Sequence, residues 1–194
     1  MITFDSSILL WLLLIPFAGG LLAWQAERLS PNTPRWIALV TMLAFFVLTV
    51  MVWLQGNYHG DALATAVSGH PVWQLEVQRD WIPRFGITFH LALDGLSMLM
   101  LLLTGFLGVL AVACSWREIE NHVGFFYLNL LWNLGGVIGV FLAVDLFLYF
   151  FFWEMMLVPM FFLIALWGHK GANGRSRISA ATKFFIYTQA SGLL

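Results

Sequence analysis

Long apolar runs alternate with short polar segments along the whole of this 194-residue sequence. A helix that crosses a lipid bilayer needs roughly 20 mostly apolar residues. Five runs meet that requirement, and a sixth is still in progress at residue 194. The pattern predicts an all-α fold, a polytopic bundle of transmembrane helices in a single membrane domain, 1–194. The predicted spans are residues 8–24, 36–54, 95–114, 124–143, 146–167 and 178–194, the last of them cut short.

The longest apolar run, residues 124–167, is too long for a single crossing. Its 44 residues would form a helix of about 66 Å, whereas the hydrocarbon core is roughly 30 Å thick. Asp145 lies near the middle of the run and can accept hydrogen bonds from the first N–H groups of a following helix. We therefore place a turn at Asp145 and predict two helices.

Residues 55–94 form the one long polar stretch and are predicted to lie outside the membrane. Within it, residues 87–91 alternate apolar and polar side chains, as a half-buried strand does. Residues 81–86 are typical of a strand followed by a turn. These features predict a small hairpin that covers one face of the membrane domain, with a structural role.

Composition supports a membrane protein and excludes several classes of function. Hydrophobic residues make up 61% of the chain and charged residues 10%, against roughly 25% charged residues in soluble domains. The net charge of −1 provides no basic surface for nucleic acid. One cysteine and five scattered histidines give neither a disulfide nor a metal-ligand pattern. We therefore expect no metal and no cofactor in this chain.

Lysine and arginine are divided unequally between the two predicted sides of the membrane. Arg79 and Arg84 lie on one side, both in the long loop, and six basic residues lie on the other. Because short cytoplasmic loops are enriched in basic residues, the N-terminus is predicted to lie outside. The six cytoplasmic residues would be Arg28, Arg35, Arg117, Lys170, Arg175 and Arg177.

Glu154 is the main candidate for chemistry, because the apolar segment 147–163 that contains it has no other ionisable residue except Tyr149. Glu154 lies about 14 Å along the helix from Asp145 and about 20 Å from Trp167, near the middle of the bilayer. Carboxylates are costly at that depth and usually handle ions or protons. Asp145 points to the opposite face, and the neighbours of Glu154 on its own helix are apolar. Its partners must therefore come from other helices or from water.

Pro159 follows Glu154 in the same helix, and its missing N–H group frees the carbonyl of Met155. A kink there could open room for water beside the glutamate. The alternative interpretation is a protonated, inert glutamate with a structural role only.

Further polar residues lie inside the predicted spans. Lys183, Tyr187 and Ser191 recur every four residues in the last span, and this stripe fits contact with protein or water better than with lipid. Lys183 alone is also explained by snorkelling to the cytoplasmic interface. Thr182, Thr188 and Gln189 flank the stripe. Proton translocation is assigned to Glu154 and Lys183, with Asn133, Asp145 and Tyr187 as supporting polar residues.

Two features of the spans are assigned to structure. Asp94 and Asp145 each precede a predicted helix, and both are interpreted first as helix caps. Gly135 and Gly139 form a pair of small residues one turn apart on the fourth span, which predicts close packing against another helix.

Three segments of the sequence resemble a known family. They are residues 93–97 (LDGLS), which open the third span, residues 152–160 (FWEMMLVPM) and residues 181–188 (ATKFFIYT). Together they resemble the antiporter-like membrane subunits of proton-pumping NADH:quinone oxidoreductase, respiratory complex I, and among these they look most like chain M. The resemblance covers nearly the whole chain. The family also includes subunits of multisubunit sodium/proton antiporters, which share the glutamate and the lysine.

The resemblance implies a longer protein, of which these residues would be the N-terminal part. The implied fold has fourteen transmembrane helices with two inverted five-helix repeats, the first beginning at the fourth span. Glu154 matches the family's fifth-helix glutamate, which pairs with a lysine on a seventh helix beyond residue 194. Lys183 matches the lysine of the sixth helix.

The resemblance also implies the protein's setting. It places the chain in the bacterial inner membrane beside other membrane subunits of one complex, including adjacent antiporter-like chains. NADH, flavin, iron–sulfur clusters and quinone would be bound by other subunits.

Three functions remain open. The first is proton translocation, coupled to electron transfer from NADH to quinone elsewhere in the complex. The second is ion exchange as a subunit of a sodium/proton antiporter, and the third is a passive membrane scaffold. In the first, Glu154 stays ionised while a cation is near, and it takes up a proton when the cation moves away, because burial disfavours the charged form.

Overall fold

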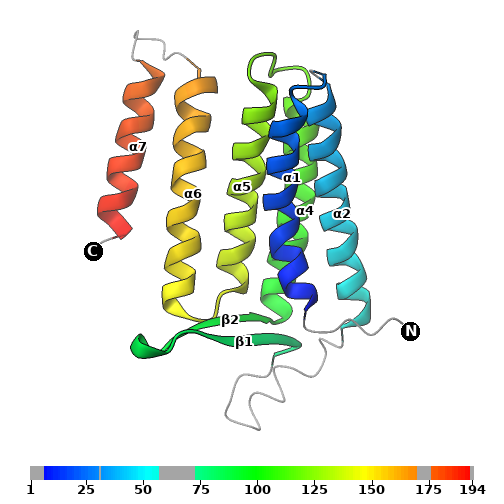
Figure 1. Ribbon diagram of the computed structural model, residues 1–194, viewed down its shortest axis with the longest axis vertical. Coiled ribbons are helices and arrows are strands. Elements are labelled where there is room, and N and C mark those ends of the chain that lie inside the picture. The colour runs from blue at the N-terminus through cyan, green and yellow to red at the C-terminus, as the bar shows by residue number, and fades with distance from the viewer. Residues whose placement is uncertain (1–6, 31, 57–72, 170–175, 193–194) are drawn as a thin grey trace.

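The computed structural model describes residues 7–30, 32–56, 73–169 and 176–192. Within these residues, helices stand side by side and a two-stranded hairpin lies across one end of them, here called the hairpin end (Figure 1). The helices are α1 (Ile8–Ala26), α2 (Thr33–Gln55), α4 (Gly95–Ser115), α5 (Val123–Leu142), α6 (Leu146–Trp167) and α7 (Arg177–Gly192).

Five helices, α1, α2, α4, α5 and α6, are long and apolar enough to cross a membrane. This confirms the predicted fold class, an all-α bundle with five complete spans. α2 begins at Thr33, three residues before the predicted start at Trp36, because Pro34 falls in the first turn, where a missing N–H group costs no helical hydrogen bond. The side on which the N-terminus lies stays a prediction.

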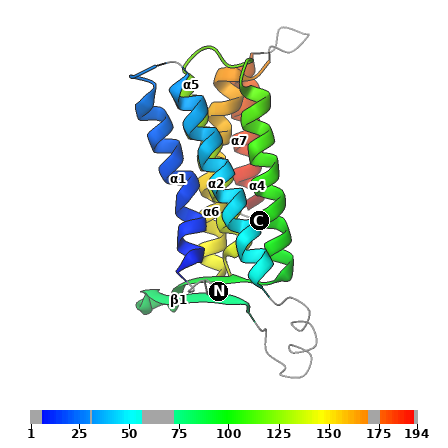
Figure 2. The same ribbon diagram turned by 90° about the vertical axis from the view of Figure 1, so that its right-hand side faces the viewer.

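The helices form a four-membered bundle with two further helices beside it. α1 packs between α2 and α5, and α4 packs against α2 and α5. α6 covers another face of α5, and α7 packs on the far side of α6, so that α5, α6 and α7 stand in a row (Figures 1 and 2). Among the described residues, α7 therefore has α6 as its main neighbour.

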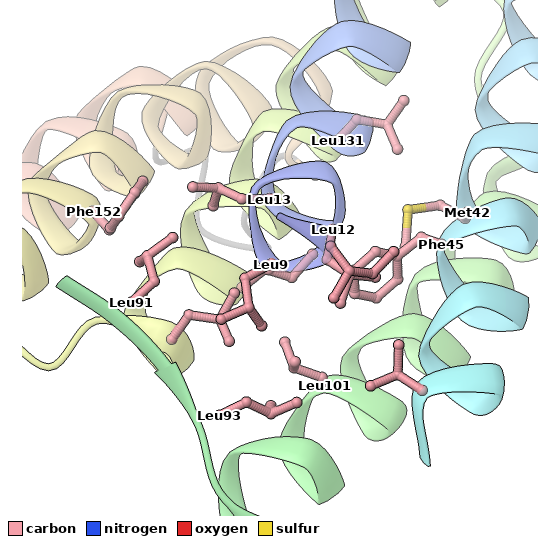
Figure 3. Packing of buried hydrophobic residues seen from close by; sticks show 14 of the residues in the cluster. Leu9, Leu12, Leu13, Met42, Phe45, Leu91, Leu93, Leu101, Leu131 and Phe152 are labelled. Atoms are coloured by element: carbon pink, nitrogen blue, oxygen red, sulfur yellow. The ribbon is translucent and has the colours of Figure 1, made fainter. Parts of the chain in front are cut away.

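The hydrophobic core lies between α1, α2, α4 and α5 and is closed at the hairpin end by the sheet. Figure 3 shows the leucine side chains of α1 between those of the second strand, Leu91 and Leu93, and Met42 and Phe45 of α2. By contrast, α7 contributes a single buried residue, Ala181. The labelled core residues are Leu9, Leu12, Leu13, Met42, Phe45, Leu91, Leu93, Leu101, Leu131 and Phe152.

Glycines allow the helices of the bundle to approach closely. A Cβ atom added at Gly19 of α1 would lie 2.3 Å from the side chain of Thr41 on α2. The same addition at Gly135 would lie 2.8 Å from the ring of Phe17, and at Gly139 it would lie 2.4 Å from the ring of Phe152. The predicted close packing at Gly135 and Gly139 is confirmed, and the groups received there are aromatic side chains of α1 and α6.

The hairpin consists of β1 (Leu75–Ile82) and β2 (Ile87–Leu93), paired antiparallel, with a short 3-10 turn, η1 (Pro83–Phe85), between them. Gly86 closes the turn at φ 68°, in the left-handed region that glycine enters without strain. The predicted hairpin is therefore confirmed. Residues 57–72 of the predicted loop, like residues 170–175 and 193–194, lie outside the described residues.

The hairpin is attached to the turn between α5 and α6. The Val144 N–H donates to the His90 carbonyl at 3.0 Å, and Leu91 forms an isolated bridge with Ala143. On β1, the ring of Trp81 meets the rings of Phe147 and Phe151, both on α6, edge to face at 5.9 Å each. The sheet thus fixes the start of α6, the helix that carries Glu154.

Candidate functional site

α6 begins at a helix cap supplied by Asp145. One carboxylate oxygen, Oδ1, accepts from the Phe147 N–H at 2.8 Å and from the Leu148 N–H at 3.2 Å. The other, Oδ2, accepts from the Thr88 N–H of β2 at 3.5 Å. Asp94 starts α4 in the same way, accepting from the Ser97 N–H at 2.7 Å. The two predicted caps are confirmed, and Asp145 is engaged by backbone donors on both oxygens.

α6 continues as one helix through Pro159. A hollow beside this proline lies between α5 and α6, and it is lined almost entirely by apolar side chains, with Asn129 the one amide among them. The hollow beside Pro159 therefore lies on the side of α6 that faces α5. The remaining lining residues are Phe125, Leu128, Trp132, Met155, Val158 and Phe162.

Glu154 is half-buried in the middle of α6, on the side that faces α7. Its Oε2 atom accepts a hydrogen bond from Nε2 of Gln189, which lies on α7. Its Oε1 atom lies beside Gly192, where an added Cβ atom would be at 3.5 Å. The prediction that the glutamate takes its partner from another helix is confirmed. The partner is the amide of Gln189, named from the sequence only as a residue flanking the polar stripe.

The face of α7 that packs on α6 is marked by residues spaced four apart. Ala181 is fully buried, the ring of Phe185 meets that of Phe161 at 6.0 Å, and Gln189 bonds Glu154. Residues two positions further on are rotated by about 200° around a helix. The polar stripe therefore lies off the line of contact with α6, and its members are the exposed residues Lys183, Tyr187 and Ser191.

The structure consequently does not bring Lys183 and Glu154 together. Lys183 is exposed and makes no hydrogen bond or ion pair with another described residue. Tyr187 is 74% exposed. The assignment of proton translocation to Glu154 and Lys183 stays a prediction, with the two residues on different sides of α7.

A groove runs between α6 and α7 beside the glutamate. Four hydroxyl-bearing residues line it, Tyr149 on α6 and Tyr187, Thr188 and Ser191 on α7. Phe150, Trp153 and Gly192 complete the lining. Tyr187 lines this groove although most of its side chain is exposed.

Asn133 occupies a different part of the molecule. It lies on α5, and α6 stands between α5 and α7 (Figure 1). Its Oδ1 atom is buried and has no hydrogen-bond partner among the described residues. Asn129, one turn earlier, instead donates to the carbonyl of Phe125 at 2.7 Å. Asn133 thus lies on one side of α6, and the face of α6 that carries Glu154 is on the other.

A second buried polar cluster lies at the opposite end of the bundle from the hairpin. The Arg35 guanidinium of α2 donates through Nη2 to the Ile119 carbonyl at 2.7 Å. It also lies beside the hydroxyl of Tyr127, a fully buried residue of α5. Ser115 of α4 donates to the same hydroxyl at 3.3 Å. This cluster joins three helices, and no local pattern predicts it, since its members come from three separate segments of the sequence.

No group of three or more His, Cys, Asp or Glu side chains that could hold a metal ion occurs within the described part of the chain.

Comparison with known proteins places the α6–α7 region in a family. A family model described as "NADH:quinone oxidoreductase/Mrp antiporter, TM" matches residues 143–194, which contain Glu154, Gln189 and the groove. NADH-quinone oxidoreductase subunit M of Escherichia coli (strain K12) is 65% identical over 187 residues, which is 96% of this chain. The chain belongs to the NADH-quinone oxidoreductase subunit M family. The subunit M of Pseudomonas aeruginosa is 62% identical over 188 residues, again 96% of this chain.

The chain spans 36% of the length of each of these two curated relatives of the subunit M family. Two solved structures share the fold. A chain of respiratory complex I from Thermus thermophilus with bound NADH matches with a TM-score of 0.74 and 24% identity, over 95% of this chain and 33% of that one. A chain of the Mrp complex from Dietzia sp. DQ12-45-1b matches with a TM-score of 0.72 and 22% identity, over 96% of this chain and 18% of that one. The chain is accordingly an integral protein of the bacterial inner membrane.

Proposed function

We propose that this chain belongs to a proton-translocating membrane subunit of NADH:quinone oxidoreductase, in which Glu154 carries the proton. Electron transfer from NADH to quinone would take place in other subunits, which bind NADH, flavin, iron–sulfur clusters and quinone. The chain's partners would be the neighbouring membrane subunits, including adjacent antiporter-like chains. It would be part of a translocating oxidoreductase without a redox site of its own.

The observation that carries this proposal is the pairing of Glu154 with a neutral amide. Glu154 lies midway along an apolar helix, and the partner that the described residues provide is Gln189. A carboxylate held by a permanent cation would stay charged, because an opposite charge nearby favours the ionised form. A carboxyl group with a neutral partner in a half-buried site can exist in both protonation states, as a proton carrier must.

Lys183 is proposed as the next group after Glu154. It stands on the far face of α7, so a proton passing from Glu154 to Lys183 would cross α7 along the row formed by α5, α6 and α7. Tyr187 and the hydroxyl groups of the groove would support transfer near Glu154. Asp145 would serve as a cap, since both its oxygens already accept from backbone N–H groups.

Substitution of the glutamate tests the proposal in membrane vesicles that contain the whole complex. NADH-driven proton uptake is followed with a pH-gradient dye, and NADH oxidation by an artificial acceptor counts the assembled complexes. Glu154→Gln is expected to lose nearly all proton uptake at normal assembly, and Glu154→Asp to keep part of it. Glu120→Gln makes the same chemical change at an exposed position and is expected to pump normally. Normal uptake by fully assembled Glu154→Gln would show that the glutamate does not carry the proton.

A sodium/proton antiporter subunit is the second candidate, supported by the shared fold of the Mrp complex chain. The two functions differ in their dependence on sodium. Proton uptake driven by NADH is expected to persist when sodium is replaced by choline, and loss of uptake on that replacement would favour the antiporter. A passive scaffold would predict that Glu154→Gln changes only the amount of assembled complex.

A further inference from the structure

We propose that Gln189 positions Glu154 for proton transfer, and that its side-chain amide is the hydrogen-bond partner of this carboxyl group in both protonation states. The inference rests on the proposed role of Glu154 and adds a residue to the same site.

The geometry of α7 directs Gln189 at the glutamate. Ala181, Phe185 and Gln189 lie four residues apart, and the first two are held against α6 by burial and by the ring contact with Phe161. The third member of that row is therefore presented to α6 at the level of Glu154, where its Nε2 atom donates to Oε2. Gly192 leaves space beside Oε1, so that the carboxyl group is not pressed from the other side.

The chemistry of an amide suits a partner that changes its charge. An ionised carboxylate can only accept hydrogen bonds, and Gln189 offers N–H donors to it. A protonated carboxyl group has an O–H donor that needs an acceptor, and the same amide offers its carbonyl oxygen after a half-turn about its last side-chain bond. A lysine at this position could only donate, and a leucine could do neither. The amide therefore avoids an unpaired polar group at membrane depth in either state.

Among the described residues, few other titratable or charged groups could interact with Glu154 in place of this amide. On α6 itself, Tyr149 lies in the groove and Asp145 caps the helix nine residues away. On α7, Tyr187 lines the groove, while Lys183, one turn earlier, is exposed and is not part of the groove lining. Among the described residues of the other elements packed on α6, Tyr127 of α5 faces Arg35 and Ser115, and His90 of β2 bonds Glu76 at 2.7 Å.

The test compares the pH dependence of protons pumped per NADH in vesicles that carry the whole complex. Gln189→Met keeps the length of the side chain and removes its hydrogen bonds. Both forms of Glu154 then lose a hydrogen bond, and the bond to the ionised form is the stronger one because it is charge-assisted. The acid limb of the pumping profile is therefore expected to move to higher pH by about one unit, a tenfold change in proton affinity. Gln189→Asn keeps the amide but shortens the side chain by one carbon, and it is expected to shift the limb in the same direction. Gln55→Met makes the first change at an exposed helix end and is expected to leave the profile unchanged.

Infrared difference spectroscopy adds a readout that a purely structural role would not move. The C=O stretch of protonated Glu154, assigned by its absence in Glu154→Gln, is expected at higher frequency in Gln189→Met, because the group loses its hydrogen bond. Gln189→Lys is expected to assemble and to stop pumping, since a fixed cation would hold Glu154 ionised.

The outcomes separate the two proposals. Normal pumping by Glu154→Gln would overturn the role of the glutamate and with it that of Gln189. An inactive Glu154→Gln together with unchanged pH profiles and an unchanged C=O band in the Gln189 variants would overturn the role of Gln189 alone. If Gln189→Met does not assemble, the profile of Gln189→Asn decides.

Discussion

The four-helix bundle and the α6–α7 pair are held together in different ways. Over 18 residues of each helix, 44% are buried in α1 and in α5, 33% in α4 and 28% in α2, against 22% in α6. In the bundle, glycines of α1, α4 and α5 receive neighbouring side chains at close range, whereas α7 has α6 as its main neighbour and contributes a single buried residue. The carboxyl group proposed to change its charge lies in the second region, where a small number of neighbours sets its environment.

The polar groups of the two regions also differ, in their charge and in the kind of hydrogen-bond partner they have. In the bundle, Arg35 is always charged and donates to a backbone carbonyl in the segment between α4 and α5, beside Tyr127. In the α6–α7 pair, Glu154 contacts one amide that can donate or accept. A fixed charge with backbone partners stabilises a junction, and a variable charge with an adaptable partner suits transfer.

The largest expected effect is that of one methyl group added to the bundle, compared with one methyl group added to the α6–α7 pair. Gly19→Ala would place Cβ 2.3 Å from Thr41, a side chain held by its bond to the Ile37 carbonyl, and is expected to lower the free energy of unfolding by about 3 kcal/mol. Gly192→Ala meets an ordinary contact at 3.5 Å and should change it by less than about 0.5 kcal/mol. Unfolding of the full-length protein in mixed micelles measures both. Equal losses would contradict the difference between the regions.

Arg35→Leu is expected to lower the free energy of unfolding by about 2 kcal/mol, because the Ile119 carbonyl loses a charged donor. Arg35→Lys should recover only part of the loss, since one ammonium group cannot reproduce the spread of a guanidinium. The control is Arg28→Leu, which removes an exposed charge from the same end of the bundle. A control as damaging as Arg35→Leu would assign the effect to net charge instead of the buried cluster.

Loss of a cap distinguishes the regions by function. Asp145→Ala and Asp94→Ala are each expected to cost about 1 kcal/mol of stability, and the matching Asn variants much less, since asparagine also caps helices. Asp145→Ala alone should also reduce NADH-driven proton uptake, because α6 carries Glu154. Equal pumping by the two Ala variants at equal assembly would show that the start of α6 does not control the site.

The smallest expected effect is at the contact between the hairpin and α6. Trp81→Leu removes two edge-to-face ring pairs and is expected to cost about 1 kcal/mol of stability. Phe85→Leu, in the turn of the same hairpin, changes a ring that is 74% exposed and should cost less than about 0.5 kcal/mol. Thermal unfolding of the two variants side by side is sufficient to compare them.

The features that sequence predicts here are local ones. Apolar runs mark the helices, Asp94 and Asp145 mark two helix starts, and alternation at residues 87–91 marks a strand, because each signal lies within a few consecutive residues. The contact between Glu154 and Gln189 joins residues 35 positions apart. α6 is apolar on every side except for this glutamate, so the sequence does not show which face meets which neighbour. The residue types of the site could be predicted, and their pairing needed the arrangement of the helices.

The bridge between Leu91 and Ala143 also has a consequence for how the protein is made. Ala143 is synthesised 52 residues after Leu91, with α4 and α5 between them. At about 5–20 residues per second, Ala143 is added to the chain roughly 3 to 10 seconds after Leu91. During that interval Leu91 and Leu93, which the finished fold buries completely, lack part of their cover. The hairpin is therefore joined to the turn before α6 only after α5 has been synthesised, and the helix that carries Glu154 is anchored in the same late step of biogenesis.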